Sequence, residues 1–141
     1  MPSLSQFKTD INLERNGVWV PVGNGLEFLI ARQGSPRFDQ EVSRLTGGTG
    51  GIQTKHNLID VEDMQEMLLI ATARACLLNW KNMQEDDGVT DIVYSADRSE
   101  AILRMYPDLY RFVSEVSTNS AMYREKVAET NAGNSEMPSD G

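Results

Sequence analysis

An apolar stretch from Val61 to Trp80 constrains the fold of this chain more than any other segment. Read at about 3.6 residues per turn, its apolar side chains cover most of the circumference of a helix. Glu62 and Asp63 lie in the first turn, where the helix dipole favours negative charge, and together with Arg74 they argue against a membrane span. A helix that is apolar nearly all round is buried among other elements or covered by a partner. The sequence therefore predicts a core helix over residues 61–82.

The net charge of the chain is −8, from 13 Lys and Arg against 21 Asp and Glu. Such a chain repels nucleic-acid phosphates unless basic residues gather on one face, and they do not cluster along the sequence. The single cysteine, Cys76, permits no internal disulfide and fits a reducing compartment. The first residues lack the apolar core of a signal peptide. These features favour a cytoplasmic protein.

A β-hairpin is predicted over residues 18–31. Val18 to Val22 alternate as a strand does, and Leu26 to Ala31 form the return strand. The intervening Gly23-Asn24-Gly25 can adopt the positive φ angles of a tight turn. Pro21 has no N–H to donate to a ladder, so its strand is expected at the edge. Because a two-stranded ribbon is marginal alone, the hairpin must lean on the core helix or pair with another chain.

Capping residues predict three further helices. Ser35 and Pro36 open a helix that ends at Leu45, and Ser95 caps a helix that runs to Met105. Pro107 separates the latter from a last amphipathic helix. The predicted fold class is therefore α+β, mainly α, with an N-terminal β-hairpin packed on a bundle of about four helices.

The chain is expected to form one domain. With 141 residues it is large enough to bury a core, and residues 1–129 are assigned to a single globular domain. Residues 1–15 are polar with scattered apolar positions, as in a loose arm or a short helix. Residues 130–141 are small, polar and interrupted by Pro and Gly, which predicts a disordered tail.

Two loops invite a ligand-binding interpretation that their residues do not support. The Gly47–Gly51 loop lacks both the Gly-Lys-Ser/Thr of a phosphate loop and the third glycine of a dinucleotide site, which favours a connector. The Glu85–Gly88 turn lacks the alternating acids of a calcium loop, which favours a solvated turn. His56 has no His or Cys at ligand spacing and is expected to be an exposed loop residue.

The sequence displays no catalytic constellation. Cys76 lies inside the apolar stretch, and the acid pairs at Glu62–Asp63 and Asp86–Asp87 have structural explanations. We therefore expect a protein that is not an enzyme and needs no cofactor or metal. The seven methionines favour core filling over the alternative of an adaptable binding surface.

Three segments occur in an order that resembles the small tail assembly chaperones of long, non-contractile-tailed bacteriophages. They are GVWVPVGNGLEFLIAR, then LLNWKN followed by the acidic DDG turn, then VYSADRSEAILRMYPDLYRFVSEVSTNSAMYRE. The resemblance covers residues 7–126, and the Gly47–Gly51 loop has no counterpart in it. The residues that match the family's motifs are Gly17, Trp19, Val20, Arg32, Trp80, Asp87, Gly88, Tyr94, Ser95, Pro107 and Tyr123.

The resemblance implies a non-structural assembly factor in the cytoplasm of the infected host, absent from the mature virion. Such a protein binds and solubilises the long, helical tape measure protein and helps to recruit tail tube subunits around it. Family members are often also made in a longer, frameshifted form. Self-association into a homo-oligomer is a further expectation, whereas binding to nucleic acid or membrane is not expected.

The partner-binding residues are expected on the first half of the core helix, at Met64, Met67 and Leu68. Methionine and leucine there can repack against many helical sequences. The Trp80 ring is expected to pack under the helix at Tyr94–Met105 while its indole N–H reaches a loop carbonyl. The residues assigned structural roles are Trp19, Trp80, Tyr94, Ser95 and Pro107.

Two other classes of function stay open. A small acidic helical adaptor of phage or prophage origin, with a binding or regulatory role, would share this composition and lack catalytic residues. Co-purification with a long helical partner would separate a chaperone from an adaptor. An enzyme is the weaker alternative, since it would need a pocket that joins His56 to two carboxylates.

Overall fold

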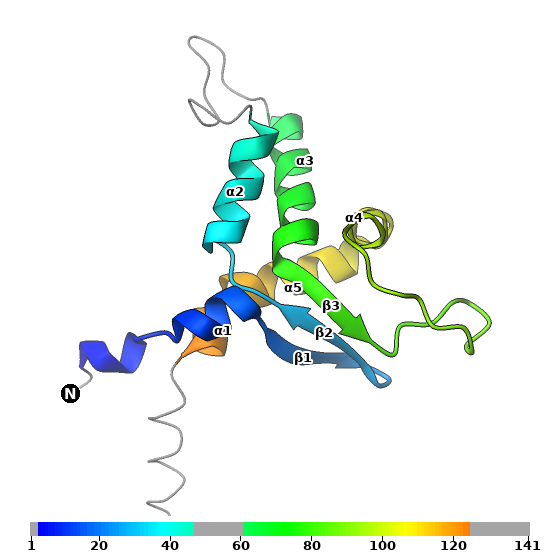
Figure 1. The fold of residues 1–141 in the computed structure, drawn as a ribbon, viewed down its shortest axis with the longest axis horizontal. Helices are drawn as coiled ribbons and strands as arrows, with labels where there is room; N and C mark the ends of the chain where they lie inside the picture. The colour runs from blue at the N-terminus through cyan, green and yellow to red at the C-terminus, as the bar shows by residue number, and fades with distance from the viewer. Residues whose placement is uncertain (1–2, 47–60, 125–141) are drawn as a thin grey trace, which may run out of the picture.

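The computed structural model describes residues 3–46 and 61–124, and within them the chain folds into five α-helices and a three-stranded antiparallel sheet (Figure 1). The predicted fold class, α+β and mainly α, is confirmed. The predictions for the Gly47–Gly51 loop, His56 and the 130–141 tail concern residues outside the described ranges. In chain order the elements are a 3-10 turn (Leu4–Phe7), α1 (Ile11–Asn16), β1 (Val18–Gly23), β2 (Leu26–Ile30), α2 (Pro36–Leu45), α3 (Val61–Ala71), a π-helical turn (Thr72–Cys76), β3 (Leu77–Lys81), α4 (Ala96–Met105), α5 (Pro107–Thr118) and a 3-10 turn (Ser120–Tyr123).

The predicted hairpin is confirmed as β1 and β2. Asn24 and Gly25 turn the chain with φ angles of 54° and 86°, the left-handed conformation that a two-residue hairpin turn needs. The strand order is β1-β2-β3, so Pro21 lies on an edge strand, as its missing N–H requires. The hairpin does not depend on a helix alone, because β3 pairs antiparallel with β2 and completes the sheet.

The predicted core helix is wrong over its last part. α3 ends at Ala71, the π-helical turn follows, and Leu77–Lys81 is a strand instead of the end of a helix. The reason is a bulge in β3: Leu29 pairs with Asn79, whereas Ile30 pairs with Leu77. The extra residue puts Leu77 and Trp80, three positions apart, on the same buried face. A bulged strand thereby reproduces the spacing of a helix.

The passage from helix to strand leaves backbone carbonyls that need new donors. The Ser99 hydroxyl donates to the Ala73 carbonyl at 2.6 Å, and the Ala31 N–H donates to Cys76 O at 2.7 Å. The Tyr94 hydroxyl donates to the carbonyl of Leu77. Because buried carbonyls are costly when unpaired, these bonds fix α4 and the end of β2 against the π-helical turn.

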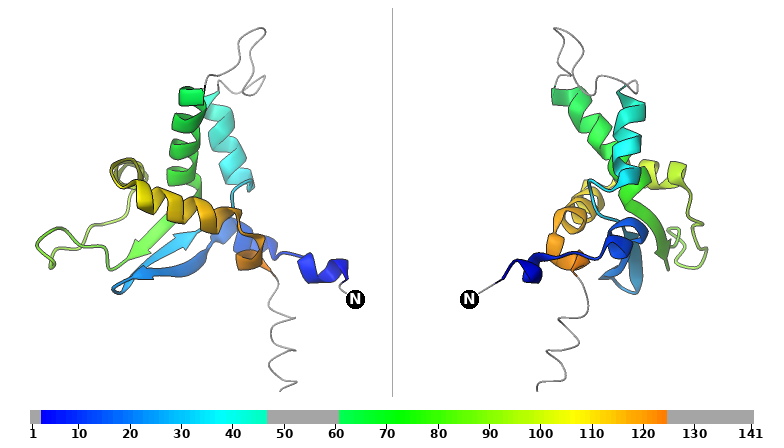
Figure 2. Two further views of the ribbon diagram at one scale, coloured as in Figure 1. Left: turned by 180° about the vertical axis from the view of Figure 1, so that it is seen from behind. Right: turned by 60° about the vertical axis from the view of Figure 1, so that its left-hand side comes forward.

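An aromatic cluster fills the space between the sheet and the helices. Phe28 of β2 meets Phe112 of α5 with ring centroids 6.3 Å apart, and Trp80 meets Tyr94 edge-on at 4.9 Å. Figure 2 shows α5 crossing that face of the sheet. The indole N–H of Trp80 donates to the Ile92 carbonyl at 2.7 Å, which confirms the predicted bond to a loop. Trp80 is 6% exposed, and it reaches this position from a strand.

The segment before the hairpin is not a loose arm throughout. Its second half forms α1, so the alternative of a short helix holds there. The Asp10 N–H donates to Tyr123 O at 2.7 Å, and Glu14 forms an ion pair with Arg32. Gly17 then takes φ +90°, and a Cβ atom at this position would come within 3.0 Å of the Leu29 side chain. The motif glycine therefore allows α1 to fold back onto the sheet.

Three residues assigned structural roles lie at element boundaries or at the surface. Ser95 caps α4, accepting from the Arg98 N–H at 3.0 Å, and Pro107 occupies the first turn of α5. Trp19 is 38% exposed, with the Lys81 ammonium 4.1 Å from its ring centroid.

Within the described residues, no helix has the length and apolarity to cross a bilayer.

Replacing Trp80 with alanine is expected to lower the free energy of unfolding by about 3–5 kcal/mol. The change removes a buried ring and leaves the Ile92 carbonyl without its donor. Urea denaturation followed by circular dichroism measures the loss. Trp19→Ala, at the more exposed ring, is the control and should cost clearly less. A loss below about 1 kcal/mol for Trp80→Ala would contradict the packing role.

Candidate partner-binding site

α2 and α3 stand side by side and project away from the sheet (Figures 1 and 2). α2 buries Phe38 and directs Val42 and Leu45 toward the core, so one face of this pair is well packed. α3 is apolar on more than one side, and α2 covers only part of it. Leu69 and Ile70 are only half-buried, which leaves some apolar surface on a projecting helix.

The three residues predicted to bind a partner do not form one open surface. Met67 is 5% exposed and is therefore part of the protein's own interior. Met64 and Leu68 lie half-buried on either side of it, and Leu68 packs against the core. A partner role for Met64 and Leu68 stays a prediction, whereas Met67 is not accessible to a partner.

A hollow of about 530 Å³ opens along α4, beside the projecting pair of helices. Its apolar lining comes from Ala101 and Met105, which are both exposed on α4, Met105 by 70%. At about 100° per residue they lie almost opposite Ser99 and Leu103, which α4 buries. We call this hollow the α4 groove; its lining residues are Arg74, Asp97, Glu100, Ala101, Arg104 and Met105.

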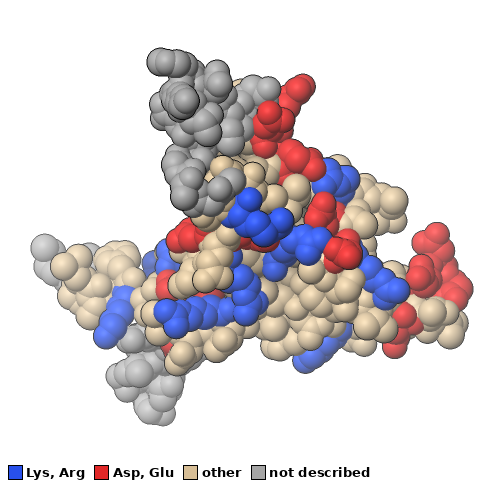
Figure 3. All heavy atoms as spheres, turned by 45° about the horizontal axis from the view of Figure 1, so that its top comes forward, with Lys and Arg blue, Asp and Glu red and all other residues tan. Residues whose placement is uncertain are grey.

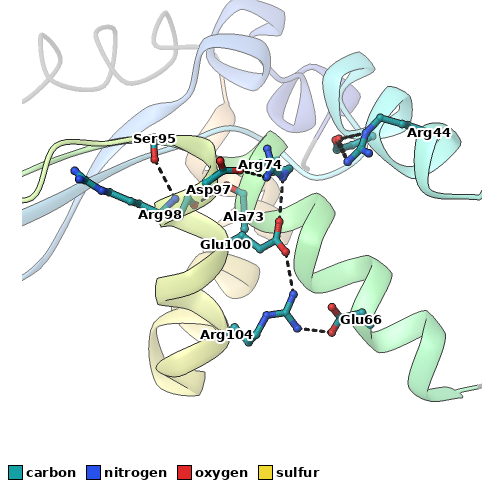
Figure 4. A network of polar contacts seen from close by, with 11 residues as sticks. Arg44, Glu66, Ala73, Arg74, Ser95, Asp97, Arg98, Glu100 and Arg104 are labelled. Carbon is teal, nitrogen blue, oxygen red and sulfur yellow. Dashed lines mark hydrogen bonds and ion pairs between the residues drawn. The ribbon is translucent and has the colours of Figure 1, made fainter.

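Charged side chains link α3, the π-helical turn and α4 beside this groove (Figure 4). Arg74 donates to Asp97 and, at 3.0 Å, to Glu100. Arg104 donates to Glu100 at 3.0 Å and to Glu66 of α3 at 2.7 Å. The hydrogen bond from Arg104 holds the pKa of the Glu66 carboxyl below its ordinary value.

These ion pairs are largely solvated, and such pairs contribute only about 0–1 kcal/mol each. Their main effect is to hold guanidinium and carboxylate groups in fixed positions around an apolar floor. An open apolar groove with paired charges at its rim suits an amphipathic helix, which can lay its apolar stripe on Ala101 and Met105.

Sequence reasoning missed Ala101, and the core filling that it favoured for the methionines is wrong for Met105, which is exposed. A signal was present, because the two residues are four positions apart and point away from the buried side of a helix whose N-cap was correctly predicted. The pattern alone did not separate an exposed apolar pair from scattered surface residues. The exposed pair is part of a charged groove only because Arg74 and Glu66, which are distant from α4 in the sequence, form ion pairs with side chains of α4.

The titratable groups that invited a chemical interpretation are held by structural contacts. Among the described residues, no group of three or more His, Cys, Asp or Glu side chains could hold a metal ion. The Thr90 hydroxyl, with the N–H groups of Thr90 and Val89, lowers the pKa of Asp87 to about 2. Asp87 therefore stays charged as the acceptor that shapes its own turn. Burial raises the pKa of the Cys76 thiol to about 12.

Comparison with known proteins gives one family. A family model described as YdaY prophage protein matches residues 33–134, which begin after β2 and include α2, α3, β3, α4 and α5. No curated protein and no solved structure matches the chain. The matched segment contains every lining residue of the α4 groove.

Cys76 is expected to resist alkylation by iodoacetamide at neutral pH in the folded protein. The thiolate is the reactive species, and a fully buried thiol with a raised pKa supplies almost none. The raised pKa also has a stability consequence. The unfolded thiol ionises above about pH 9 while the folded one stays protonated to about 12, so this group lowers stability across that range and has no effect below it. Mass spectrometry of samples labelled with and without denaturant checks the protection; fast labelling without denaturant would contradict it.

Proposed function

We propose that this chain, which belongs to the YdaY prophage protein family, is a tail assembly chaperone. In this role it binds and solubilises a tape measure protein and helps to recruit tail tube subunits around it. The role is non-enzymatic, needs no cofactor, and is carried out in the cytoplasm of the host cell without entry into the mature virion.

The observation that carries this proposal is the α4 groove. Long helical proteins expose apolar stripes before assembly, and a chaperone for them needs an apolar surface that is open in the free protein. Ala101 and Met105 supply such a surface. The half-buried Leu69 and Ile70 add some apolar area on the neighbouring α3.

The residues that resemble the chaperone family support the same assignment through their structural roles. Tyr94 and Ser95 fix the start of α4, one by its bond to Leu77 O and the other as the N-cap. Trp80 packs against Tyr94, and Pro107 sets the turn from α4 to α5. The motif residues therefore support the element that carries the groove.

The proposal is tested by co-expression with the tape measure protein encoded by the same prophage. Wild type is expected to raise the soluble fraction of that protein, and Ala101→Glu/Met105→Glu is expected to abolish the rescue. Both positions are exposed, so the free energy of unfolding of the double variant should differ from that of wild type by no more than about 0.5 kcal/mol. The two glutamates place charge where an apolar stripe would lie.

Val89→Glu/Val93→Glu is the matched control. It makes the same change in charge at valines that are 77% and 71% exposed and lie outside the groove. This control should rescue solubility as wild type does. If wild type fails to rescue, the chaperone role is wrong and the adaptor alternative is favoured. If the groove variant rescues fully, the chaperone binds through another surface.

A further inference from the structure

The α4 groove is one end of a longer arginine-lined surface. A second hollow of about 370 Å³ shares Arg74 with the groove and is also lined by Arg44 and Arg37 of α2. A third, of about 340 Å³, shares Arg37 and adds Arg15 of α1. A fourth shares Arg15 and ends at Arg32. We call these four adjoining hollows the arginine track, and Figure 3 shows basic residues gathered across the middle of this face.

The arginine track differs in charge from the chain as a whole. The chain carries −8, whereas the described residues that line the track include six arginines and four carboxylates. Every one of these carboxylates is paired with an arginine of the track. The pairs are Glu14–Arg32, Glu41–Arg44, Asp97–Arg74 and Glu100–Arg74.

Two arginines in the middle of the track take part in none of these ion pairs. Arg15 and Arg37 are exposed and line the third hollow together. Neither has a hydrogen-bond or ion-pair partner among the described residues. A guanidinium group presents planar donors that fit a carboxylate, so two such groups beside one hollow form a recognition surface for acidic side chains.

The composition of the track favours a polypeptide over a nucleic acid. No aromatic residue is found among the described lining residues, so the track offers no platform on which bases could stack. An apolar groove at one end and free guanidinium groups in the middle instead match a chain that carries both apolar and acidic side chains.

We propose that the arginine track binds a negatively charged amphipathic helix. The apolar stripe of this helix occupies the α4 groove, and its carboxylates pair with Arg37 and Arg15 further along. The inference rests on the proposed function, because it specifies the chemistry of the tape measure segment that the protein binds. In this proposal, Arg15 and Arg37 make the protein prefer an acidic helix over other helices that are equally apolar.

Three synthetic helical peptides with the same leucine stripe test this proposal. Their flanking positions carry Glu, Gln or Lys, and fluorescence anisotropy measures their binding to the full-length protein. The Glu peptide is expected to bind most tightly. Arg15→Glu and Arg37→Glu are each expected to weaken it about tenfold, with a smaller effect at high salt. Arg111→Glu makes the same charge change at an exposed position of α5, outside the track, and should leave binding unchanged.

The remaining outcomes separate this inference from the proposed function. Equal binding of the three peptides, or no binding by any of them, overturns the acidic-helix assignment, whereas the solubility test is judged on its own result. Tighter binding of a single- or double-stranded oligonucleotide, lost in Arg15→Glu and Arg37→Glu, would assign the track to nucleic acid and also overturn it. If the Glu peptide binds as expected but solubility is not rescued, the track stands and the chaperone role fails.

Discussion

The hydrogen bonds accepted by backbone carbonyls in and just after the π-helical turn are the interaction on which the rest of the structure depends. An apolar helix that ends inside the protein leaves carbonyl groups without donors, and each would be costly to bury unpaired. Here the donors come from Ser99, Ala31 and Tyr94, which belong to different parts of the chain. Satisfying one helix end therefore fixes the start of α4 and the end of β2, the central strand. Because the α4 groove lies on this helix, these bonds also fix the position of the groove.

Local signals in the sequence predicted the elements whose cause is local. The hairpin follows from alternation around Gly23-Asn24-Gly25, and α2 and α4 begin at Ser35 and Ser95 because a side-chain oxygen there caps the first turn. The Trp80 bond to a loop carbonyl was also predictable, since a buried indole N–H needs an acceptor. β3 was not predictable in this way. Its spacing is that of a helix, and only the open edge of β2 makes it a strand.

The candidate site was less accessible to sequence reasoning because its residues come from separate elements. Arg15, Arg37, Arg74 and Arg104 are far apart in the sequence, and no stretch of it is basic. The fold brings them together along adjoining hollows of an acidic chain. Likewise, methionine content pointed to α3, where Met67 proved to be buried. A surface assembled from separate elements gives no regular spacing of residues in the sequence, which is why the predicted helix faces did not reveal it.

The pairing of β2 with β3 also shapes how the chain reaches its folded state. Phe28 and Trp80 lie opposite each other although about fifty residues, including α2 and α3, separate them in the sequence. Closing a loop of that size costs entropy before any contact forms, whereas the hairpin and the helices have local contacts from the start. We therefore expect the third strand to join the sheet late. Until it does, the open edge of β2 and the apolar face of Phe28 remain accessible to other chains, a hazard during synthesis for a protein whose proposed role is to prevent aggregation.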